Sequence, residues 1–139
     1  MTLKLDWLQE ELHFKNAPDS PPIELHGSKH GVTSPTQALA YSVMGCMAMD
    51  IVHMLQKGRH PLESLSVTFE GQRAEHPPRR YTAIHLHFDL TGDIPDDAVT
   101  RAIALSHEKY CSVSNSLQPD IDFKTTFTIV RPQDGSRAE

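Results

Sequence analysis

The sequence contains only two cysteines, Cys46 and Cys111, among its 139 residues. They lie far apart and lack the close spacing of a zinc knuckle or a thioredoxin-like motif, so only the fold can bring them together. The 7 glycines form no close cluster, and no nucleophile elbow, phosphate-binding loop or dinucleotide fingerprint is present. We therefore expect no cofactor.

Positive charge is also scarce. The 13 Lys and Arg residues stand against 18 Asp and Glu, for a net charge of -5, and no basic stripe offers itself to phosphates. Nucleic acid is not an expected partner. The start of the chain lacks the layout of a signal peptide, and no run approaches the roughly 20 apolar residues of a membrane span. We expect a cytoplasmic protein with no membrane partner.

In the cytoplasm, ordinary thiols are kept reduced, so any disulfide between the two cysteines is expected to be transient. The composition, 38% hydrophobic and 22% charged, is that of an ordinary globular protein. The length fits a single domain over residues 1–139. Short alternating apolar runs at residues 3–7, 12–15 and 23–25 predict three antiparallel strands.

A long helix follows over Pro35–Lys57, because Ser34 is a good cap and proline is favoured in the first turn. Gly58 is expected to end this helix as a left-handed residue. Between Ala38 and Leu55 the helix is apolar nearly all round, which places it at the centre of a core. Six short strands cover such a helix poorly, so we expect a partner chain to complete the cover.

Two further strands are predicted at residues 65–73 and 81–90. The acidic stretch 93–97 then begins a second helix that runs to about Cys111. A last strand, Asp122–Val130, precedes a polar tail at 132–139 that we expect to fray. The predicted order is βββ-α-ββ-α-β, an α+β fold.

A thiol that reacts with peroxide must be ionised and reachable, and a second thiol lets the resulting sulfenic acid condense into a disulfide. Cys46 and Cys111 are candidates for such a pair. The alternative is that both are small buried hydrophobic residues. Asp50, one helical turn after Cys46, opposes thiolate formation, whereas His53 could offset it. Alternatively, Asp50 and His53 bond each other or a nearby backbone group.

Several side chains of acceptable ligand type could in principle assemble a metal site. They are Cys46, Asp50 or His53, His107 and Cys111. No local ligand motif supports them, so no metal site is predicted. His85 and His87 share one face of a strand and are expected to be exposed imidazoles.

Two segments carry a family resemblance. Residues 34–52, around Met44-Gly45-Cys46, and residues 105–113, ending in Tyr110-Cys111-Ser112-Val113, resemble the two cysteine helices of the OsmC/Ohr family of osmotically inducible and organic hydroperoxide resistance proteins. Residues 81–88 are similar to its central strand. The resemblance implies an OsmC-like fold in an intertwined homodimer, in which sheets wrap two central helices and the two cysteines lie close together.

The resemblance also implies an activity. Family members that reduce organic hydroperoxides attack with the first cysteine and resolve the product with the second, and a dithiol reductant then reduces the disulfide. Carried over, Cys46 attacks hydroperoxide and Cys111 resolves, in oxidative-stress defence.

The chain departs from the active members of this family at two places. Those members have an arginine in the N-terminal strand region and a glutamate in the first turn of the first cysteine helix. Here the first arginine is Arg59, and the helix begins Pro35-Thr36-Gln37. Without a substitute cation Cys46 is expected to be mostly protonated at neutral pH. The possible substitutes are Lys15, Lys29, Arg73, Arg79 and Arg80.

These departures place the chain closer to the less characterised OsmC-like branch. They also favour an alternative, a non-catalytic protein that binds a small apolar ligand or senses redox state. The methionine-rich helix supports this alternative, because thioether side chains adapt to irregular ligands. These methionines are Met44, Met47, Met49 and Met54.

Overall fold

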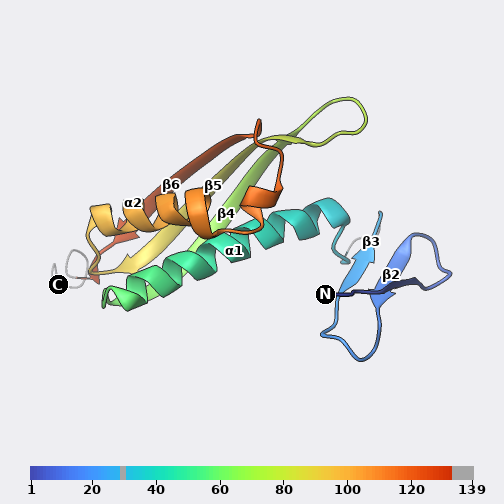
Figure 1. Ribbon diagram of the computed structural model, residues 1–139, viewed down its shortest axis with the longest axis horizontal. Helices are drawn as coiled ribbons and strands as arrows, with labels where there is room; N and C mark the ends of the chain where they lie inside the picture. The colour runs from blue at the N-terminus through green and yellow to red at the C-terminus, as the bar shows by residue number, and fades with distance from the viewer. Residues whose placement is uncertain (29–30, 133–139) are drawn as a thin grey trace. The chain divides into compact units, whose positions relative to one another are not determined.

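The computed structural model describes residues 1–28 and 31–132 (Figure 1). The elements are β1 (Leu5–Trp7), β2 (His13–Asn16), β3 (Glu24–His26), α1 (Pro35–Lys57), β4 (Leu62–Arg73), β5 (Tyr81–Gly92), α2 (Asp96–Leu105), a π-helix (Ser106–Tyr110), a 3-10 turn (Ser114–Ser116) and β6 (Asp122–Val130). The predicted α+β class and strand and helix order are confirmed.

Two compact units divide the chain, Met1–Tyr41 and Ser42–Glu139. The single domain over residues 1–139 stays a prediction. The predicted frayed tail, apart from Pro132, lies outside the described residues.

The first unit holds a three-stranded antiparallel sheet in the order β1-β2-β3. Each strand begins or ends within about two residues of its predicted position, which is the usual uncertainty of strand ends. The pairing of β2 with β3 sets His13 opposite His26, and their ring centroids lie 5.3 Å apart.

Helix α1 begins as predicted, with Ser34 as its cap. The Gln37 amide donates to Ser34 Oγ at 3.2 Å, and the Ser34 amide donates to Gln37 Oε1 at 3.0 Å. This reciprocal capping box satisfies two donors at the helix start.

The predicted end of α1 is wrong in one respect. The left-handed residue is Arg59, at φ 61°, and not Gly58. The Arg59 amide donates to Gln56 O at 2.9 Å and the His60 amide to Leu55 O at 3.0 Å, which together form a Schellman motif. Gly58 still occupies the last turn, where its amide donates to Met54 O at 3.0 Å.

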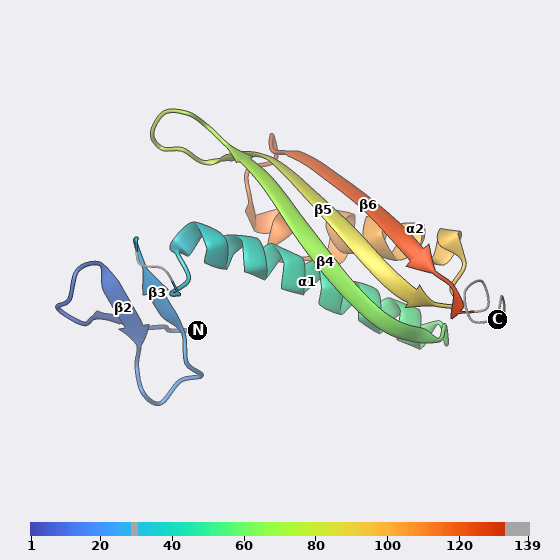
Figure 2. The same cartoon turned by 180° about the vertical axis from the view of Figure 1, so that it is seen from behind.

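The second unit is a three-stranded sheet, β4-β5-β6, with α2 and the part of α1 that belongs to this unit on one face (Figures 1 and 2). Strand β5 is central, antiparallel to β4 and parallel to β6. Alternate β5 side chains enter the core, as the period of two predicts. They are Ile84, Leu86, Phe88 and Leu90. His85 and His87 lie on the opposite face, partly exposed, and both hydrogen-bond Thr126 Oγ1.

Helix α1 is buried within the chain on one face only. Every fourth residue from Val43 to Leu55 is at most 1% exposed, while Met49 is 73% exposed and Tyr41 64%. We predicted that no segment is long and apolar enough to span a membrane. Judged by length and composition alone, this prediction is wrong, because an 18-residue window of α1 has a mean hydropathy of 1.5. A core helix reaches the same values, and the buried face of α1 is of that kind.

Candidate functional site

The structure brings the two predicted site cysteines together within the second unit. Cys46 lies in the middle of α1, and Cys111 caps the π-helix that continues α2. The two thiols interact, because a hydrogen bond from the Cys111 thiol is among the causes that lower the pKa of Cys46. Cys46 is partly exposed, whereas Cys111 is fully buried, so of the two cysteines only Cys46 has surface open to molecules from outside.

Cys111 owes its position to the unusual end of the second helix. The chain continues past Leu105 as one π turn, Ser106–Tyr110, closed by a 2.7 Å hydrogen bond from the Cys111 amide to Ser106 O. Such turns often occur at functional sites because they re-aim the residues that follow. Ser106 is buried, and its hydroxyl donates to Asp50 Oδ2 at 2.9 Å, which joins the π turn to α1.

The segment after Cys111, residues 111–116, surrounds the cysteine pair with polar groups. The Ser114 amide donates to Cys111 Sγ at 3.3 Å. The Asn115 side-chain amide donates to His107 O at 2.9 Å and to Cys111 O at 2.8 Å. The Ser116 hydroxyl donates to Ser112 O at 2.7 Å. We call residues 111–116 the cysteine loop.

The pKa of Cys46 is lowered from its ordinary value. Partial burial of the sulfur acts in the opposite direction, but three hydrogen bonds to the sulfur outweigh it. The donors are the Val113 amide, the Cys111 thiol and the Ser112 hydroxyl, while the Asp50 carboxylate opposes them. A hydrogen bond to the charged form of a group favours that form.

The pKa of Cys111 is raised. Burial is the main cause, and the neighbouring Cys46 adds to it through its hydrogen bond and its charge. The Ser114 hydroxyl and amide reduce the increase without reversing it. The two thiols therefore differ, because the pKa of Cys46 is shifted down and the pKa of Cys111 is shifted up.

The pKa of Cys46 is lowered without a positive charge among the causes, because hydrogen bonds from the cysteine loop lower it. That Cys46 is mostly protonated at neutral pH without a substitute cation stays a prediction. Two of the proposed substitutes interact elsewhere. Lys15 Nζ lies 4.0 Å from Glu24, and Arg80 lies 2.9 Å from Asp120. The Arg73 Nε donates to Arg79 O at 2.8 Å. Lys29 lies outside the described residues.

The remaining candidate ligands do not assemble around the sulfur atoms. Asp50 accepts a hydrogen bond from the Ser106 side chain. The partner in this bond is therefore neither of those considered from the sequence, His53 or a nearby backbone group. The His107 ring stacks on Phe123 at 4.3 Å, and its Nδ1 is buried without a partner. Across the described ranges 1–28 and 31–132, no three His, Cys, Asp or Glu side chains are arranged to hold a metal ion.

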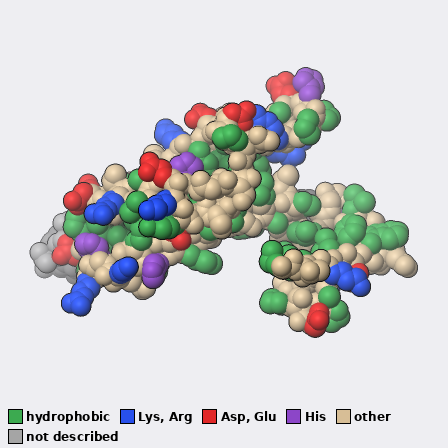
Figure 3. Space-filling view, in the orientation of Figure 1, with side chains coloured by type: hydrophobic (Ala, Val, Ile, Leu, Met, Phe, Trp, Pro, Cys, Tyr) green, Lys and Arg blue, Asp and Glu red, His purple; other side chains and the backbone are tan. Residues whose placement is uncertain are grey.

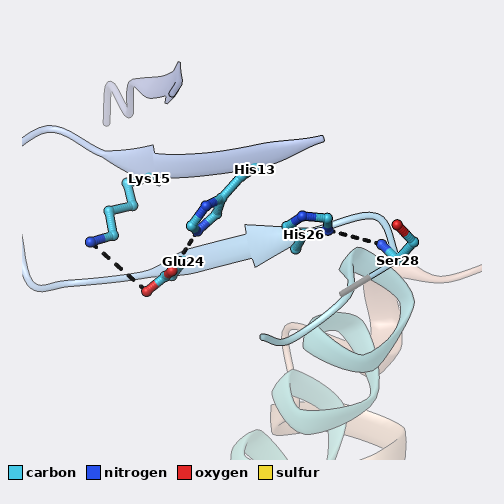
Figure 4. Close-up of polar contacts among 5 residues, drawn as sticks. All are labelled: His13, Lys15, Glu24, His26 and Ser28. Atoms are coloured by element: carbon cyan, nitrogen blue, oxygen red, sulfur yellow. Dashed lines mark hydrogen bonds and ion pairs between the residues drawn. The ribbon is translucent and has the colours of Figure 1, made fainter. Parts of the chain in front are cut away.

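A polar cluster in the first unit had no signal in the sequence (Figure 4). His13 bonds Glu24, which also faces Lys15, and the Ser28 amide donates to His26 Nδ1 at 3.0 Å. The alternation of β2 and β3 predicts two sheet faces but not their register, and the register is what brings His13 and His26 together.

Two clefts open in the second unit, and Cys46 lines neither of them. The larger, about 930 Å³, lies between the C-terminal half of α1 and α2, with Asp50, His53 and Arg101 among its polar walls. The smaller, about 290 Å³, is bordered by His107 and Phe123. In the space-filling view the surface of this unit mixes charged, histidine and hydrophobic side chains (Figure 3).

The sequence interpretation missed the cysteine loop. Its signal was the run of small polar residues directly after Cys111, namely Ser112, Ser114, Asn115 and Ser116. Hydroxyl and amide side chains of this kind bond nearby backbone groups at helix ends.

Comparison with known proteins identifies relatives over nearly the whole chain. A family model described as OsmC-like protein matches residues 27–126. Protein YhfA of Escherichia coli strain K12 is 34% identical over 132 residues, which cover 94% of this chain and 98% of YhfA.

Solved structures of other proteins are also similar to this chain. A hypothetical protein from Aquifex aeolicus VF5 has a TM-score of 0.84 at 25% identity, covering 94% of this chain and 96% of its own. A Legionella pneumophila protein, described as an organic hydroperoxide resistance protein OsmC and predicted redox protein, has a TM-score of 0.70 at 22% identity, covering 92% and 97%. The latter likeness concerns the fold.

Proposed function

Because the chain belongs to the OsmC-like family, as its two cysteine segments predicted, we propose that it is a thiol-dependent peroxidase acting on organic hydroperoxides. The observation that carries the proposal is the division of roles between the two sulfur atoms. Cys46 is partly exposed and its pKa is lowered, while Cys111 is buried, its pKa is raised and its thiol interacts with Cys46.

The cycle follows from that division. The Cys46 thiolate attacks the outer peroxide oxygen, the O–O bond breaks, and the alcohol leaves after taking a proton. The sulfenic acid on Cys46 then condenses with the Cys111 thiol, forming a disulfide and releasing water. A dithiol reductant restores both thiols and becomes a disulfide itself. Since Cys46 is partly exposed and Cys111 is buried, the reductant attacks the Cys46 sulfur and Cys111 leaves.

Burial protects the second step. Cys111 has no exposed surface, so peroxide reaches Cys46 first, and the resolving thiol waits within hydrogen-bonding reach. Rapid condensation keeps Cys46 from further oxidation to sulfinic acid, which most cells do not reverse. We place this cycle in the cytoplasm, where dithiol reductants are available.

Turnover of cumene hydroperoxide and hydrogen peroxide with dithiothreitol as the donor tests the proposal. The wild-type protein is expected to turn over at least one of them, and Cys46→Ser to turn over neither. Cys111→Ser should form sulfenic acid on Cys46 but no intramolecular disulfide. If the wild-type protein reduces neither peroxide and mass spectrometry finds no disulfide after oxidant, the proposal is wrong.

The second candidate is a protein that binds a small apolar ligand without catalysis. The 930 Å³ cleft favours it, because the cleft has the size of a ligand site and apolar walls that include Met54 and Leu105. A Cys46→Ser variant that keeps ligand-induced thermal stabilisation, in a protein without peroxidase turnover, supports this candidate. Loss of stabilisation with that substitution contradicts it.

We also propose that the functional unit is a homodimer. The face of α1 that bears Tyr41 and Met49 is apolar and exposed within a single chain. Gly45 lies on α1 between them, and a side chain added there meets nothing closer than 4.0 Å. A second copy that packs on this face removes the exposed apolar surface from water.

A further inference from the structure

The donors that favour the Cys46 thiolate come from a part of the chain with little regular structure. Ser112 and Val113 lie between the π-helix and the short 3-10 turn, where their carbonyl oxygens accept hydrogen bonds from Ser116. Whether these donors reach the Cys46 sulfur therefore depends on what holds the cysteine loop.

One side chain bridges the two ends of that segment. The Asn115 Nδ2 atom carries two hydrogens, and both are used, one on His107 O at 2.9 Å and the other on Cys111 O at 2.8 Å. The Asn115 backbone amide also donates to Cys111 O, at 3.2 Å. The last carbonyls of the π-helix are thereby satisfied by the residue that closes the loop.

From these contacts we propose that Asn115 is a positioning residue, which fixes the cysteine loop at Cys111 and so sets the surroundings of the Cys46 sulfur. The inference rests on the role proposed above for Cys46. It adds a residue outside the cysteine pair that sets the reactivity of that pair.

Asparagine suits this position for a chemical reason. A carboxylate has no hydrogen to donate, and a single hydroxyl donates only once, so neither can bond two carbonyl oxygens at the same time. Both hydrogen bonds of the Asn115 amide go to carbonyl oxygens and not to sulfur, so Asn115 acts through the loop. Its side chain is exposed, and its substitution is expected to leave the core intact.

The test measures Cys46 alkylation by iodoacetamide as a function of pH, with peptide mass spectrometry to separate Cys46 from Cys111. Asn115→Ala should move the midpoint to higher pH and slow alkylation about tenfold at pH values below the midpoint, the effect of one hydrogen bond to a charged group. Asn115→Leu keeps the shape without donors and should do the same. Asn115→Gln keeps both donors and should restore most of the rate.

Two controls separate positioning from stability. Gln118→Ala changes an exposed side chain just beyond the loop, and Val99→Ala destabilises α2 from its buried face. Both should leave the Cys46 midpoint unchanged, although Val99→Ala lowers the melting temperature. If Asn115→Ala fails to fold, Asn115→Leu decides the question.

A folded Asn115→Ala or Asn115→Leu variant with the wild-type midpoint overturns the inference. An equal shift of the Cys46 alkylation midpoint in Val99→Ala also overturns the inference. The alkylation assay uses no peroxide, so it stands apart from turnover. If the Asn115 variants shift the midpoint but the wild-type protein has no peroxidase activity, the role of Asn115 is supported and the proposed function is contradicted. If the wild-type protein turns over peroxide but the variants leave the midpoint unchanged, the proposed function is supported and the role of Asn115 is contradicted.

Discussion

Among the residues that the structure describes, Asp50 opposes the Cys46 thiolate through its charge, so its neutralisation should make that thiol more reactive. Asp50→Asn is the suitable change. The asparagine carbonyl can accept the 2.9 Å hydrogen bond that the Ser106 hydroxyl gives to Asp50 Oδ2, so the link between α1 and the π turn is kept. Only the negative charge is lost.

The size of the effect follows from the helix. Residues four apart on a helix have Cβ atoms about 5–6 Å apart. Two unit charges about 6 Å apart interact by about 0.7 kcal/mol in a water-like dielectric and by about 2.8 kcal/mol at an effective dielectric constant of about 20. Because Cys46 and Asp50 are both partly exposed, we expect the lower part of this range. About 0.7–1.4 kcal/mol corresponds to a thiolate fraction about three to ten times larger at pH values below the midpoint.

The direction of the expected pKa change of Cys46 follows from the charges. A carboxylate destabilises a neighbouring thiolate, so removal of the carboxylate lowers the pKa of Cys46 and moves the alkylation midpoint to lower pH. The assay is the pH profile of Cys46 alkylation at low ionic strength, repeated at high salt, where screening should shrink the difference between wild type and variant.

Asp97→Asn is the matched control. Asp97 lines the same cleft as Asp50, but it is not among the groups that shift the pKa of Cys46. Its neutralisation should leave the midpoint near the wild-type value. A midpoint in Asp50→Asn that stays in place or moves to higher pH refutes the electrostatic reasoning.

Three other substitutions test separate parts of the structure. Ser112→Ala removes one donor from the Cys46 sulfur and should slow alkylation about tenfold at pH values below the midpoint; an unchanged profile contradicts the assigned bond. Met49→Lys should halve the mass measured by light scattering if α1 lies in a dimer interface, and an exposed control, Gln72→Lys, should not; an unchanged mass argues against this interface. Phe88→Ala should cost about 3–5 kcal/mol in denaturant unfolding, and a loss below about 2 kcal/mol contradicts its central place in the core.

Features that depend on neighbouring residues were predictable from the sequence. Helix α1 begins at Pro35 because Ser34 and Gln37 cap it locally, and β5 buries alternate residues because the period of a strand is two. The last strand, β6, has the predicted bounds, Asp122–Val130. The family resemblance likewise rested on contiguous residues around each cysteine.

Local rules also failed where two conformations are close in energy. Gly58 and Arg59 can both end a helix, and the chain places the left-handed turn at Arg59, where Leu55 O and Gln56 O find their donors. The second helix was predicted as regular to about Cys111, but its last turn is a π turn, for which residues 106–110 carry no periodic signal.

The chemistry of the two cysteines was decided by the tertiary structure alone. The sequence determined that the chain carries two thiols, one on an apolar helix and one at the end of the second helix, and that it lacks the two charged residues that the family resemblance led us to expect. The family resemblance implied that the thiols lie close together. The residues alone could not show this, or that Ser112 and Val113 interact with Cys46, because these contacts join segments far apart in the chain. A hydrogen bond depends on the distance and angle between its groups, and only the packing of α1 against the π turn sets those for Cys46 and Cys111.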